Sequence, residues 1–387
     1  MLKVVIDATP VAPRPSGVGF YVANLISALD ALQEKENFQL GIVYQPGVKK
    51  WLRGNLSFPE CLQEYSHRHM LPIPVRISDL LLAIAFKPSL SYFEKYFGYP
   101  DILHGTNFSV YPCNNCLKVM NIYDLTFIKY PHYIDSVVQT YRERVKHCLQ
   151  WTDLVITISE SSKKDIVEYL NVKPEKIYIT SLASRYHPNY LCNENIPELK
   201  KQVNYDFSQP YLVFVSTIEP RKNITAIISA FNYLKKKYKI EHKLILIGKK
   251  GWNYEQIFTA IDNSPWKNEI LHLDYLSDEL VALFYSKADV FVYPSHYEGF
   301  GLPVLEAMTL GAPVVSSQTS SIPEVAGDAA LLINPNEPIQ LAEAILKVIS
   351  DSQLRQQLIK KGKEQAKLFT WERTAKETLQ AYKSLIT

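Results

Sequence analysis

Hydrophobic positions along this chain fall into two kinds of pattern that alternate from the first residues onward. Short unbroken apolar runs, rich in β-branched residues, are typical of parallel strands buried on both faces. Longer stretches between them repeat apolar residues every three or four positions, as one face of a helix does. The alternation therefore predicts β-α units and parallel sheets covered by helices.

Strands are expected in two series, separated by a segment at residues 182–210 that shows no clear period and holds Pro188, Pro197 and Pro210. The first series covers residues 3–7, 40–44, 101–105, 117–124, 153–159 and 176–180; the second covers residues 211–216, 243–248, 269–276, 289–295 and 312–317. Helix caps are expected at Ser159, Asn223 and Ser277. The fold class is thus α/β, with two Rossmann-like doubly wound domains.

Length and composition argue against several classes of protein. A length of 387 residues suits two domains. A net charge of +3, from 42 basic and 39 acidic residues, argues against nucleic acid as a partner. Five cysteines do not form an evident disulfide framework. The first residues indicate a strand instead of a signal peptide, and no apolar stretch approaches the roughly 18–20 residues of a membrane span, so we expect a cytoplasmic protein.

The richest chemical pattern follows the strand expected at residues 289–295. A glycine turn leads into a helix there, and Pro303 suits the first helical turn. The N–H groups at such a helix start can bind an anion. Glu298 and Glu306 flank this turn, and carboxylates beside a phosphate are favourable only if they accept hydrogen bonds from hydroxyls, such as those of a sugar and a ribose. On spacing alone, a glycine turn with two solvated glutamates is an equal alternative.

Two further clusters lie at strand ends. Arg221 and Lys222 can neutralise a diphosphate, although a solvated basic loop is the commoner meaning of such a pair. Gly17 and Gly19 form a weak G-x-G, and Val22 stands where the dinucleotide pattern needs its final glycine. NAD binding is therefore disfavoured.

Together these stretches resemble glycosyltransferase family four, whose members have the two-domain GT-B architecture. The resemblance covers nearly the whole chain and rests on E-x7-E at residues 298–306, EPRKN at 219–223, and the segments 320–335 and 370–375. It implies an N-terminal acceptor-side domain at 1–190 and a C-terminal nucleotide-sugar donor domain at 191–370, facing across a cleft. It also implies that the last helix, at 371–387, packs back on the N-terminal domain.

The resemblance also implies roles for individual residues. Arg221 and Lys222 would bind the diphosphate, Glu298 the hydroxyls of the donor sugar, and Glu306 the ribose. Further donor contacts are implied at Gly17, Gly19, Gly248, Tyr275, Leu276, Gly299, Phe300, Gly301 and Leu302. His104 corresponds loosely to a family histidine beside the donor sugar, which makes it a catalytic candidate together with Arg221, Lys222 and Glu298; its alternative is a structural histidine at a strand end.

The implied activity is that of a retaining hexosyltransferase that uses neither a metal nor a cofactor. We expect transfer of glucose, from UDP-glucose, to a glycan or a lipid-linked saccharide in polysaccharide biosynthesis. One alternative is a GDP-mannose-dependent mannosyltransferase, and another is an inactive nucleotide-sugar-binding scaffold. Residues 75–98 mix apolar and basic positions, which fits either packed helices or a peripheral contact with the inner face of a membrane.

The chain departs from the family pattern at several positions. Phe20 and Tyr123 stand where many relatives carry Arg and His, which leaves the acceptor side open. The C-x2-C of Cys113 and Cys116 lacks a second pair for zinc, so two loop cysteines are the preferred interpretation. Glu298 lies outside any predicted core, so its truncation is expected to cost little stability.

Overall fold

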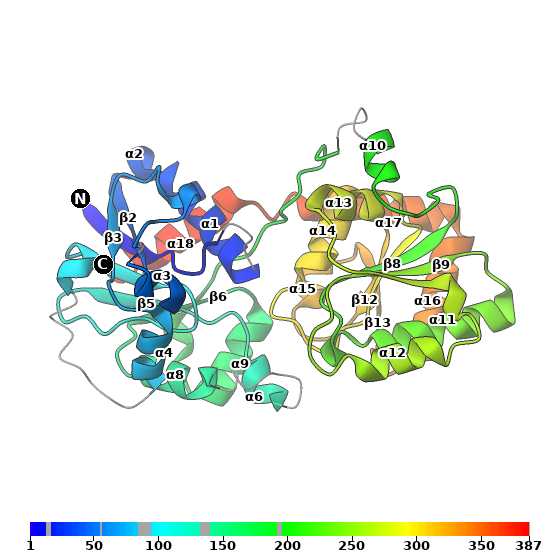
Figure 1. Cartoon of the computed structure of the whole chain (residues 1–387), viewed down its shortest axis with the longest axis horizontal. Coiled ribbons are helices and arrows are strands. Elements are labelled where there is room, and N and C mark those ends of the chain that lie inside the picture. The colour runs from blue at the N-terminus through cyan, green and yellow to red at the C-terminus, as the bar shows by residue number, and fades with distance from the viewer. Residues whose placement is uncertain (13–16, 55, 84–93, 132–139, 192–195, 387) are drawn as a thin grey trace. The chain divides into compact units, whose positions relative to one another are not determined.

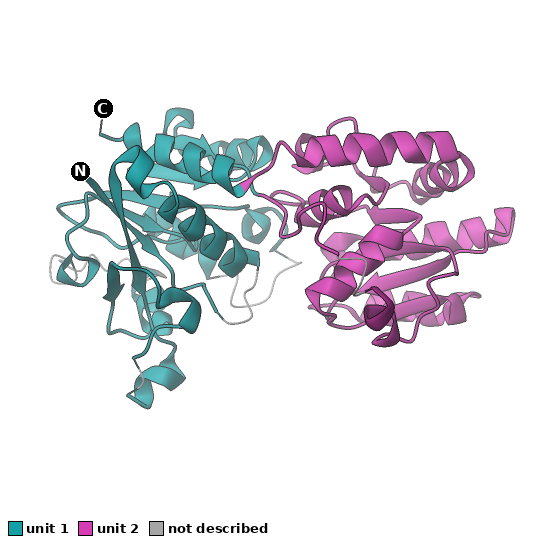
Figure 2. Cartoon of the chain, turned by 90° about the horizontal axis from the view of Figure 1, so that it is seen from above, with its two compact units in different colours: residues 1–182, 371–387 teal, residues 183–370 magenta. Residues whose placement is uncertain are grey.

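The computed structural model describes residues 1–12, 17–54, 56–83, 94–131, 140–191 and 196–386. They divide into two compact units, which Figure 2 distinguishes by colour. Unit 1 comprises Met1–Leu182 and Trp371–Thr387, and unit 2 comprises Ala183–Thr370. Each unit is built on its own parallel sheet.

Unit 1 contains a seven-stranded parallel sheet in the order β3-β2-β1-β4-β5-β6-β7 (Figure 1). Its strands are β1 (Leu2–Asp7), β2 (Phe38–Tyr44), β3 (Arg68–Met70), β4 (Ile102–Gly105), β5 (Leu117–Asn121), β6 (Leu154–Thr157) and β7 (Ile177–Ile179). Val4, Ile6 and Ile42 are fully buried in the centre of this sheet, as the unbroken apolar runs predict. The strand order reverses between β1 and β4, and such a switch point is where doubly wound sheets bind ligands.

Helices of unit 1 occupy the connections between these strands. They are α1 (Gly17–Asp30), α2 (Gln33–Glu36), α3 (Val48–Leu52), α4 (Val75–Ala83), α6 (Thr126–Lys129), α8 (Tyr141–Cys148) and α9 (Glu160–Leu170), with short 3-10 turns η1 (Glu60–Leu62), η2 (Lys95–Phe97) and η4 (Pro174–Lys176). Ser159 caps α9 as predicted, because its side chain accepts a hydrogen bond from the Ser162 backbone N–H at 3.0 Å.

The last helix, α18 (Trp371–Lys383), belongs to unit 1 although it follows unit 2 in the sequence. It lies beside α1 (Figure 1). The Trp371 ring packs edge-on against Phe20 at 5.8 Å and tilted against Tyr21 at 6.2 Å. The Thr374 hydroxyl donates to the Ser181 carbonyl at 2.6 Å. The return of the C-terminal helix to the N-terminal domain is therefore confirmed. Phe20, at the position where many relatives carry Arg, serves this packing.

Unit 2 contains a six-stranded parallel sheet in the order β10-β9-β8-β11-β12-β13. Its strands are β8 (Tyr211–Val215), β9 (Lys243–Ile247), β10 (Ile270–Leu273), β11 (Val290–Tyr293), β12 (Val314–Ser317) and β13 (Ala330–Ile333). The order is that of a Rossmann sheet, with its switch point between β8 and β11. The predicted α/β class with two Rossmann-like domains is confirmed.

The helices of unit 2 are α10 (Ile196–Lys201), α11 (Ile224–Tyr238), α12 (Glu255–Asp262), α13 (Asp278–Lys287), α14 (Leu302–Leu310), α15 (Ile322–Ala326), α16 (Pro338–Ser350) and α17 (Ser352–Ala366), with η6 (Pro220–Lys222) and η7 (Lys267–Glu269). Ser277 caps α13 as predicted. Asn223 precedes α11, but the prediction that its side chain caps the helix is wrong. Its backbone is left-handed, with φ at 56°, and its side-chain amide donates instead to the carbonyls of Pro294 and Pro335.

Two smaller findings concern cysteines and membranes. Cys113 and Cys116 are paired as a disulfide in the turn before β5, a bridge that the sequence analysis did not predict. No helix in the described part of the chain is long and apolar enough to cross a bilayer. Part of the segment at 75–98 that was singled out for membrane contact, residues 84–93, lies outside the described residues.

Candidate functional site

The switch point of unit 2 brings together two loops that are far apart in the sequence. Strands β8 and β11 are hydrogen-bonded neighbours, so the segments that follow them leave the same edge of the sheet. The backbone N–H of His296 donates to the Arg221 carbonyl at 3.0 Å, which fixes one loop against the other. This pairing places Arg221 and Lys222 against Glu298.

Glu298 is only 7% exposed, and its carboxylate is surrounded by donors. One oxygen, Oε1, accepts from Lys222 Nζ at 2.6 Å, Ser295 Oγ at 2.6 Å and the Tyr293 hydroxyl at 2.9 Å. The other, Oε2, accepts from the Arg221 guanidinium at 3.1 Å. The expectation of an exposed loop carboxylate that can be truncated at little cost is therefore wrong. The physical reason is that the loop folds inward over the buried Lys222 and the partly buried Arg221.

The backbone of Glu298 is held as firmly as its side chain. Its N–H donates to the Ser320 hydroxyl at 2.9 Å, and its carbonyl accepts from the Ser321 hydroxyl at 2.8 Å. Both serines belong to the segment between β12 and α15, which is part of the family-like stretch at 320–335. That stretch therefore contributes to the site by orienting Glu298.

Glu298 and Lys222 favour their charged forms in spite of their burial. Burial raises the pKa of Glu298, but the charges of Lys222 and Arg221 outweigh this and lower it to about 2. Burial and the neighbouring charge of Arg221 lower the pKa of Lys222, but Glu298, Tyr293 and Glu219 together raise it above its ordinary value. Glu219, 1% exposed, accepts from the second guanidinium nitrogen of Arg221 at 2.7 Å, and burial raises its pKa. Two cations thus face two carboxyl groups at the edge of the sheet.

A second cluster surrounds Glu306, one helix further along the chain. Glu306 lies in α14 and is 2% exposed. Its Oε1 accepts from Arg185 Nε at 2.6 Å, and its Oε2 accepts from the Tyr285 hydroxyl at 3.4 Å. Burial raises the pKa of Glu306, while Arg185 opposes the rise. Arg185 also contacts Asp278 at 3.1 Å, so it bridges a buried and an exposed carboxylate.

The glycine turn between the two glutamates has the predicted form. Helix α14 begins at Leu302 with Pro303 in its first turn, as expected. Gly301 has φ at +107°, and a Cβ there would lie 2.7 Å from Ile322 Cδ1. Phe300 is buried and packs edge-on against Phe369 at 5.6 Å. Because the Phe300 side chain points into the core, the surface of the turn consists of backbone atoms. Gly299 directly precedes Phe300 in the same loop.

The residues expected near a nucleotide base are more dispersed. Gly248 has φ at +147°, and a Cβ there would lie 1.9 Å from the Ser216 carbonyl oxygen, so close packing alone requires this glycine. Tyr275 is 61% exposed, with Lys249 Nζ 4.6 Å from its ring centroid. Leu276 packs against the apolar cluster that contains Leu280. Tyr275 is the member of this set that offers an open surface to a ligand.

In unit 1, His104 lies at the end of β4 and is completely buried. Its Nδ1 shares a hydrogen bond with the Tyr382 hydroxyl at 2.6 Å, and its Nε2 shares one with Asn121. Burial lowers the pKa of His104 to about 4. These contacts fit a structural histidine at a strand end, the alternative that the sequence left open. A catalytic role for His104 therefore gains no support from its surroundings.

The two candidate-site glycines of unit 1, Gly17 and Gly19, have different surroundings. Gly17 is exposed at the start of α1, and a Cβ there would meet nothing within 4 Å. Gly19 is buried within the same helix. The preceding residues 13–16 lie outside the described part of the chain.

Sequence reasoning missed several members of both clusters. Tyr293 ends the apolar strand β11 and Ser295 follows it, and neither residue gave a signal of its own. Arg185 lies in the segment without periodicity, 121 residues before its partner Glu306. Within the described ranges, no three or more His, Cys, Asp or Glu side chains are grouped so as to hold a metal ion.

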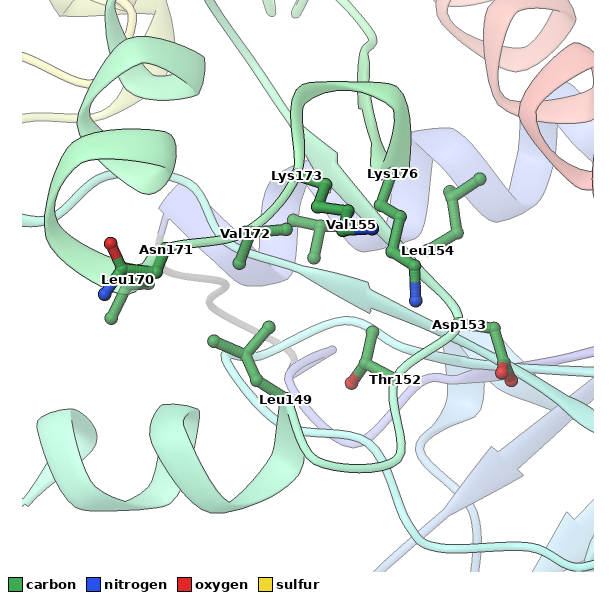
Figure 3. A pocket seen from close by; sticks show the side chains of 10 residues that line it. All are labelled: Leu149, Thr152, Asp153, Leu154, Val155, Leu170, Asn171, Val172, Lys173 and Lys176. Carbon is green, nitrogen blue, oxygen red and sulfur yellow. The ribbon is translucent and has the colours of Figure 1, made fainter.

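A separate pocket in unit 1 does not involve any predicted site residue. It has a volume of about 300 Å³ and lies between the start of β6 and the segments that follow α8 and α9 (Figure 3). Asp153 and Lys176 contribute polar groups to its wall (Figure 3). It therefore lies at the amino ends of the strands, opposite the edge where doubly wound sheets bind ligands.

Comparison with known proteins agrees with the fold and identifies the family. Residues 195–365 match the family described as glycosyl transferases group 1. The chain is 32% identical over 393 residues to O-antigen chain mannosyltransferase B of Escherichia coli, which covers 99% of this chain and 100% of that protein. The chain therefore belongs to the group 1 glycosyltransferases, which confirms the family suggested by its E-x7-E and EPRKN motifs.

Other relatives extend this comparison. The serotype-specific mannosyltransferase WbdA of Escherichia coli is 27% identical over 238 residues, which cover 60% of this chain and 29% of that protein. Sucrose-phosphate synthase from Thermosynechococcus elongatus superposes with a TM-score of 0.72 at 20% identity, covering 100% of this chain and 99% of that one. WaaG, a glycosyltransferase involved in lipopolysaccharide biosynthesis, superposes with a TM-score of 0.68 at 14% identity, over 97% of this chain and 98% of that one. These structures confirm the GT-B fold.

Proposed function

We propose that this glycosyltransferase moves mannose from GDP-mannose to a saccharide acceptor in the synthesis of a bacterial polysaccharide. The names of its relatives support mannose, since O-antigen chain mannosyltransferase B matches along the whole chain and WbdA matches along part of it. UDP-glucose, the donor preferred from sequence alone, has no comparable support. The mannose alternative therefore replaces glucose as the leading hypothesis.

The observation that best supports an active enzyme, as opposed to an inactive scaffold, is the ion-pair cluster of Arg221, Lys222 and Glu298. In the proposed complex, the two cations stabilise the negative charge of the departing diphosphate. Glu298 accepts hydrogen bonds from hydroxyls of the donor sugar, and the backbone at Phe300, Gly301 and Leu302 faces the phosphate and sugar. The start of α14 adds its partial positive charge.

Transfer with retention at the anomeric carbon fits this arrangement. The bond between the anomeric carbon and the phosphate oxygen breaks as the acceptor hydroxyl bonds to the same face of the sugar. The leaving phosphate oxygen takes the hydroxyl proton, so no protein nucleophile is needed. Side chains and backbone N–H groups supply the positive charge, and a metal ion is therefore not required. The protein contributes charge stabilisation and positioning.

Gly17 and Gly19 of unit 1 are proposed as further donor contacts, and unit 1 is proposed as the domain that binds the acceptor. A lipid-linked saccharide would require contact with a membrane surface. Helix α4 supports such a contact, because Ile77, Leu80 and Leu81 are exposed on it next to Arg76.

The test is release of nucleoside diphosphate from purified protein. GDP-mannose should be hydrolysed slowly alone and faster with a mannose-terminated oligosaccharide, and Lys222→Ala should reduce both rates by at least about 100-fold. Lys361→Ala, which removes an exposed lysine on α17, is the matched control and should keep wild-type rates. Turnover of UDP-glucose without turnover of GDP-mannose would overturn the mannose proposal. Tight binding with no release from any donor would establish the inactive scaffold instead.

A further inference from the structure

Residues 183–191, between β7 and α10, have no regular secondary structure. They belong to unit 2 and pack against its other elements. Arg185 binds Glu306 and Asp278, at 2.6 and 3.1 Å. Tyr186 is 4% exposed, and its ring packs edge-on against Tyr285 at 6.3 Å. Two consecutive residues of an irregular segment are therefore built into the surroundings of Glu306.

Two polar groups in this cluster, on Glu306 and Tyr186, have capacity for a ligand, and Arg185 lies beside them. The Glu306 carboxylate offers about four lone-pair positions, and the hydrogen bonds from Arg185 and Tyr285 occupy two of them. The Tyr186 hydroxyl is buried and has no hydrogen-bond partner in the described part of the chain. The Arg185 side chain is 39% exposed, so it lies at the rim of the cluster. Adjacent acceptor and hydroxyl groups of this kind suit a vicinal diol.

We propose that Arg185 and Tyr186 complete the part of the donor site that recognises the ribose diol of a nucleoside diphosphate. Glu306 accepts a hydrogen bond from one ribose hydroxyl, and the Tyr186 hydroxyl bonds to the other. Arg185 is a positioning residue, which holds the Glu306 carboxylate toward the diol. The inference rests on the proposed function, because that function brings a ribose to Glu306.

The proposal and a purely structural role for Tyr186 predict different effects of substitution. Burial and the neighbouring Glu306 raise the pKa of Tyr186, so its hydroxyl keeps its proton and can donate. A tyrosine that only fills space would be replaceable by phenylalanine without consequence for any ligand. An arginine that only neutralises a buried carboxylate would affect melting but not the choice between ribose and deoxyribose.

The test measures the dissociation constants of GDP, 2′-deoxy-GDP and 3′-deoxy-GDP by calorimetry. The wild-type protein should bind GDP about tenfold more tightly than each deoxy analogue, the loss of one hydrogen bond at a buried site. Tyr186→Phe should weaken GDP by a similar factor and abolish discrimination against one analogue only. Glu306→Gln should reduce discrimination against the other. Tyr190→Phe, in the same segment and packed on Tyr186, is the matched control and should behave as wild type.

Arg185 is tested by a conservative pair. Arg185→Gln should weaken GDP about tenfold and reduce the preference for GDP over both deoxy analogues, because the Glu306 carboxylate loses the group that orients it. Arg185→Lys should restore part of both effects. This pair also carries the test if Tyr186→Phe does not fold.

The outcomes distinguish this inference from the proposed function. If the wild-type protein bound no nucleoside diphosphate, the proposed function itself would be overturned. If it bound GDP and both deoxy analogues equally, the diol would not be recognised, and the inference would fail alone. It would also fail if the wild type discriminated but Tyr186→Phe and Arg185→Gln kept the same ratios and only melted earlier.

Discussion

Glu298 illustrates how a single residue can combine a binding role with a structural one. Its carboxylate neutralises Lys222 and Arg221 in the interior of unit 2. Removal of one partner from a buried ion pair typically costs about 3–5 kcal/mol, since the other charge is left without compensation. Binding of a diphosphate to the same cations would supply the missing negative charge.

Replacement of Glu298 by glutamine should therefore affect stability as well as turnover. We expect Glu298→Gln to lower the free energy of unfolding by about 3 kcal/mol and turnover by at least about 100-fold. Added GDP should stabilise the variant more than the wild type, because its phosphates neutralise Lys222 and Arg221. Thermal melting with and without GDP measures this. Unchanged melting of the variant would show that the cations do not depend on Glu298.

The low pKa of Glu298 gives this residue a characteristic dependence on pH. Its pKa falls from 4.5 to about 2 on folding, so the carboxylate stabilises the native state fully above pH 4.5. That contribution, on the order of 3 kcal/mol, is lost as the pH falls from 4.5 toward 2. The stability difference between wild type and Glu298→Gln should thus be constant above about pH 5 and shrink below it. A difference that stayed constant down to pH 3 would contradict the assigned ion pairs.

At the residue scale, the sequence identified the charged residues of the candidate site but not which of them form ion pairs. Arg221, Lys222, Glu298 and Glu306 were found because they follow strands or lie in a recognisable motif. Arg185 was missed because its contact with Glu306 spans 121 residues and leaves no local pattern. The burial of Glu298 was missed because a loop sequence does not reveal that its residues fold inward onto distant cations.

At the scale of elements, apolar runs predicted most of the strands. Strand β3 was missed because its three residues, Arg68–Met70, contain no apolar run. Strand β13 was missed because its apolar stretch, Ala330–Ile333, lies in a segment interpreted only through the family. The Asn223 cap failed for a different reason: long-range hydrogen bonds to Pro294 and Pro335 engage its side chain. Local propensity describes an element, whereas tertiary contacts decide its ends.

The glycines at the starts of two helices should respond differently to substitution. Gly301→Ala should reduce stability by about 1–3 kcal/mol, because alanine at φ +107° is strained and its Cβ would approach Ile322. Gly17→Ala should leave stability unchanged, since a Cβ there meets nothing within 4 Å. If the backbone at Gly17 approaches the donor phosphate, as the family implies, Gly17→Ala should still reduce turnover. Normal turnover in a stable Gly17→Ala variant would remove Gly17 from the donor site.

For the whole molecule, the proposed chemistry predicts independence from divalent metals. In the proposed mechanism, Arg221, Lys222 and the start of α14 would provide the charge that a metal ion supplies in other transferases. Activity with GDP-mannose should therefore persist in excess EDTA at a rate within about twofold of the untreated enzyme, measured as release of GDP. Loss of activity that magnesium or manganese restored would require a metal at the diphosphate and a revised role for the two cations.

The identity of the donor is also a property of the whole molecule, because in the proposed complex the base, ribose, diphosphate and sugar would contact different segments. Side chains near Tyr275 and Leu276 do not distinguish guanine from uracil in the sequence, and mannose is favoured only through relatives. A ligand present at 100 times its dissociation constant stabilises the native state by about 2.7 kcal/mol, which a thermal-shift assay detects readily. GDP-mannose and GDP should raise the melting temperature, whereas UDP-glucose and UDP at equal concentration should not. The Lys222→Ala variant should lose the response to both guanine ligands, while Lys361→Ala should keep it. A melting shift with UDP-glucose alone would make UDP-glucose the preferred donor again. A shift with both donors would mean that the protein does not select its donor by the nucleotide base.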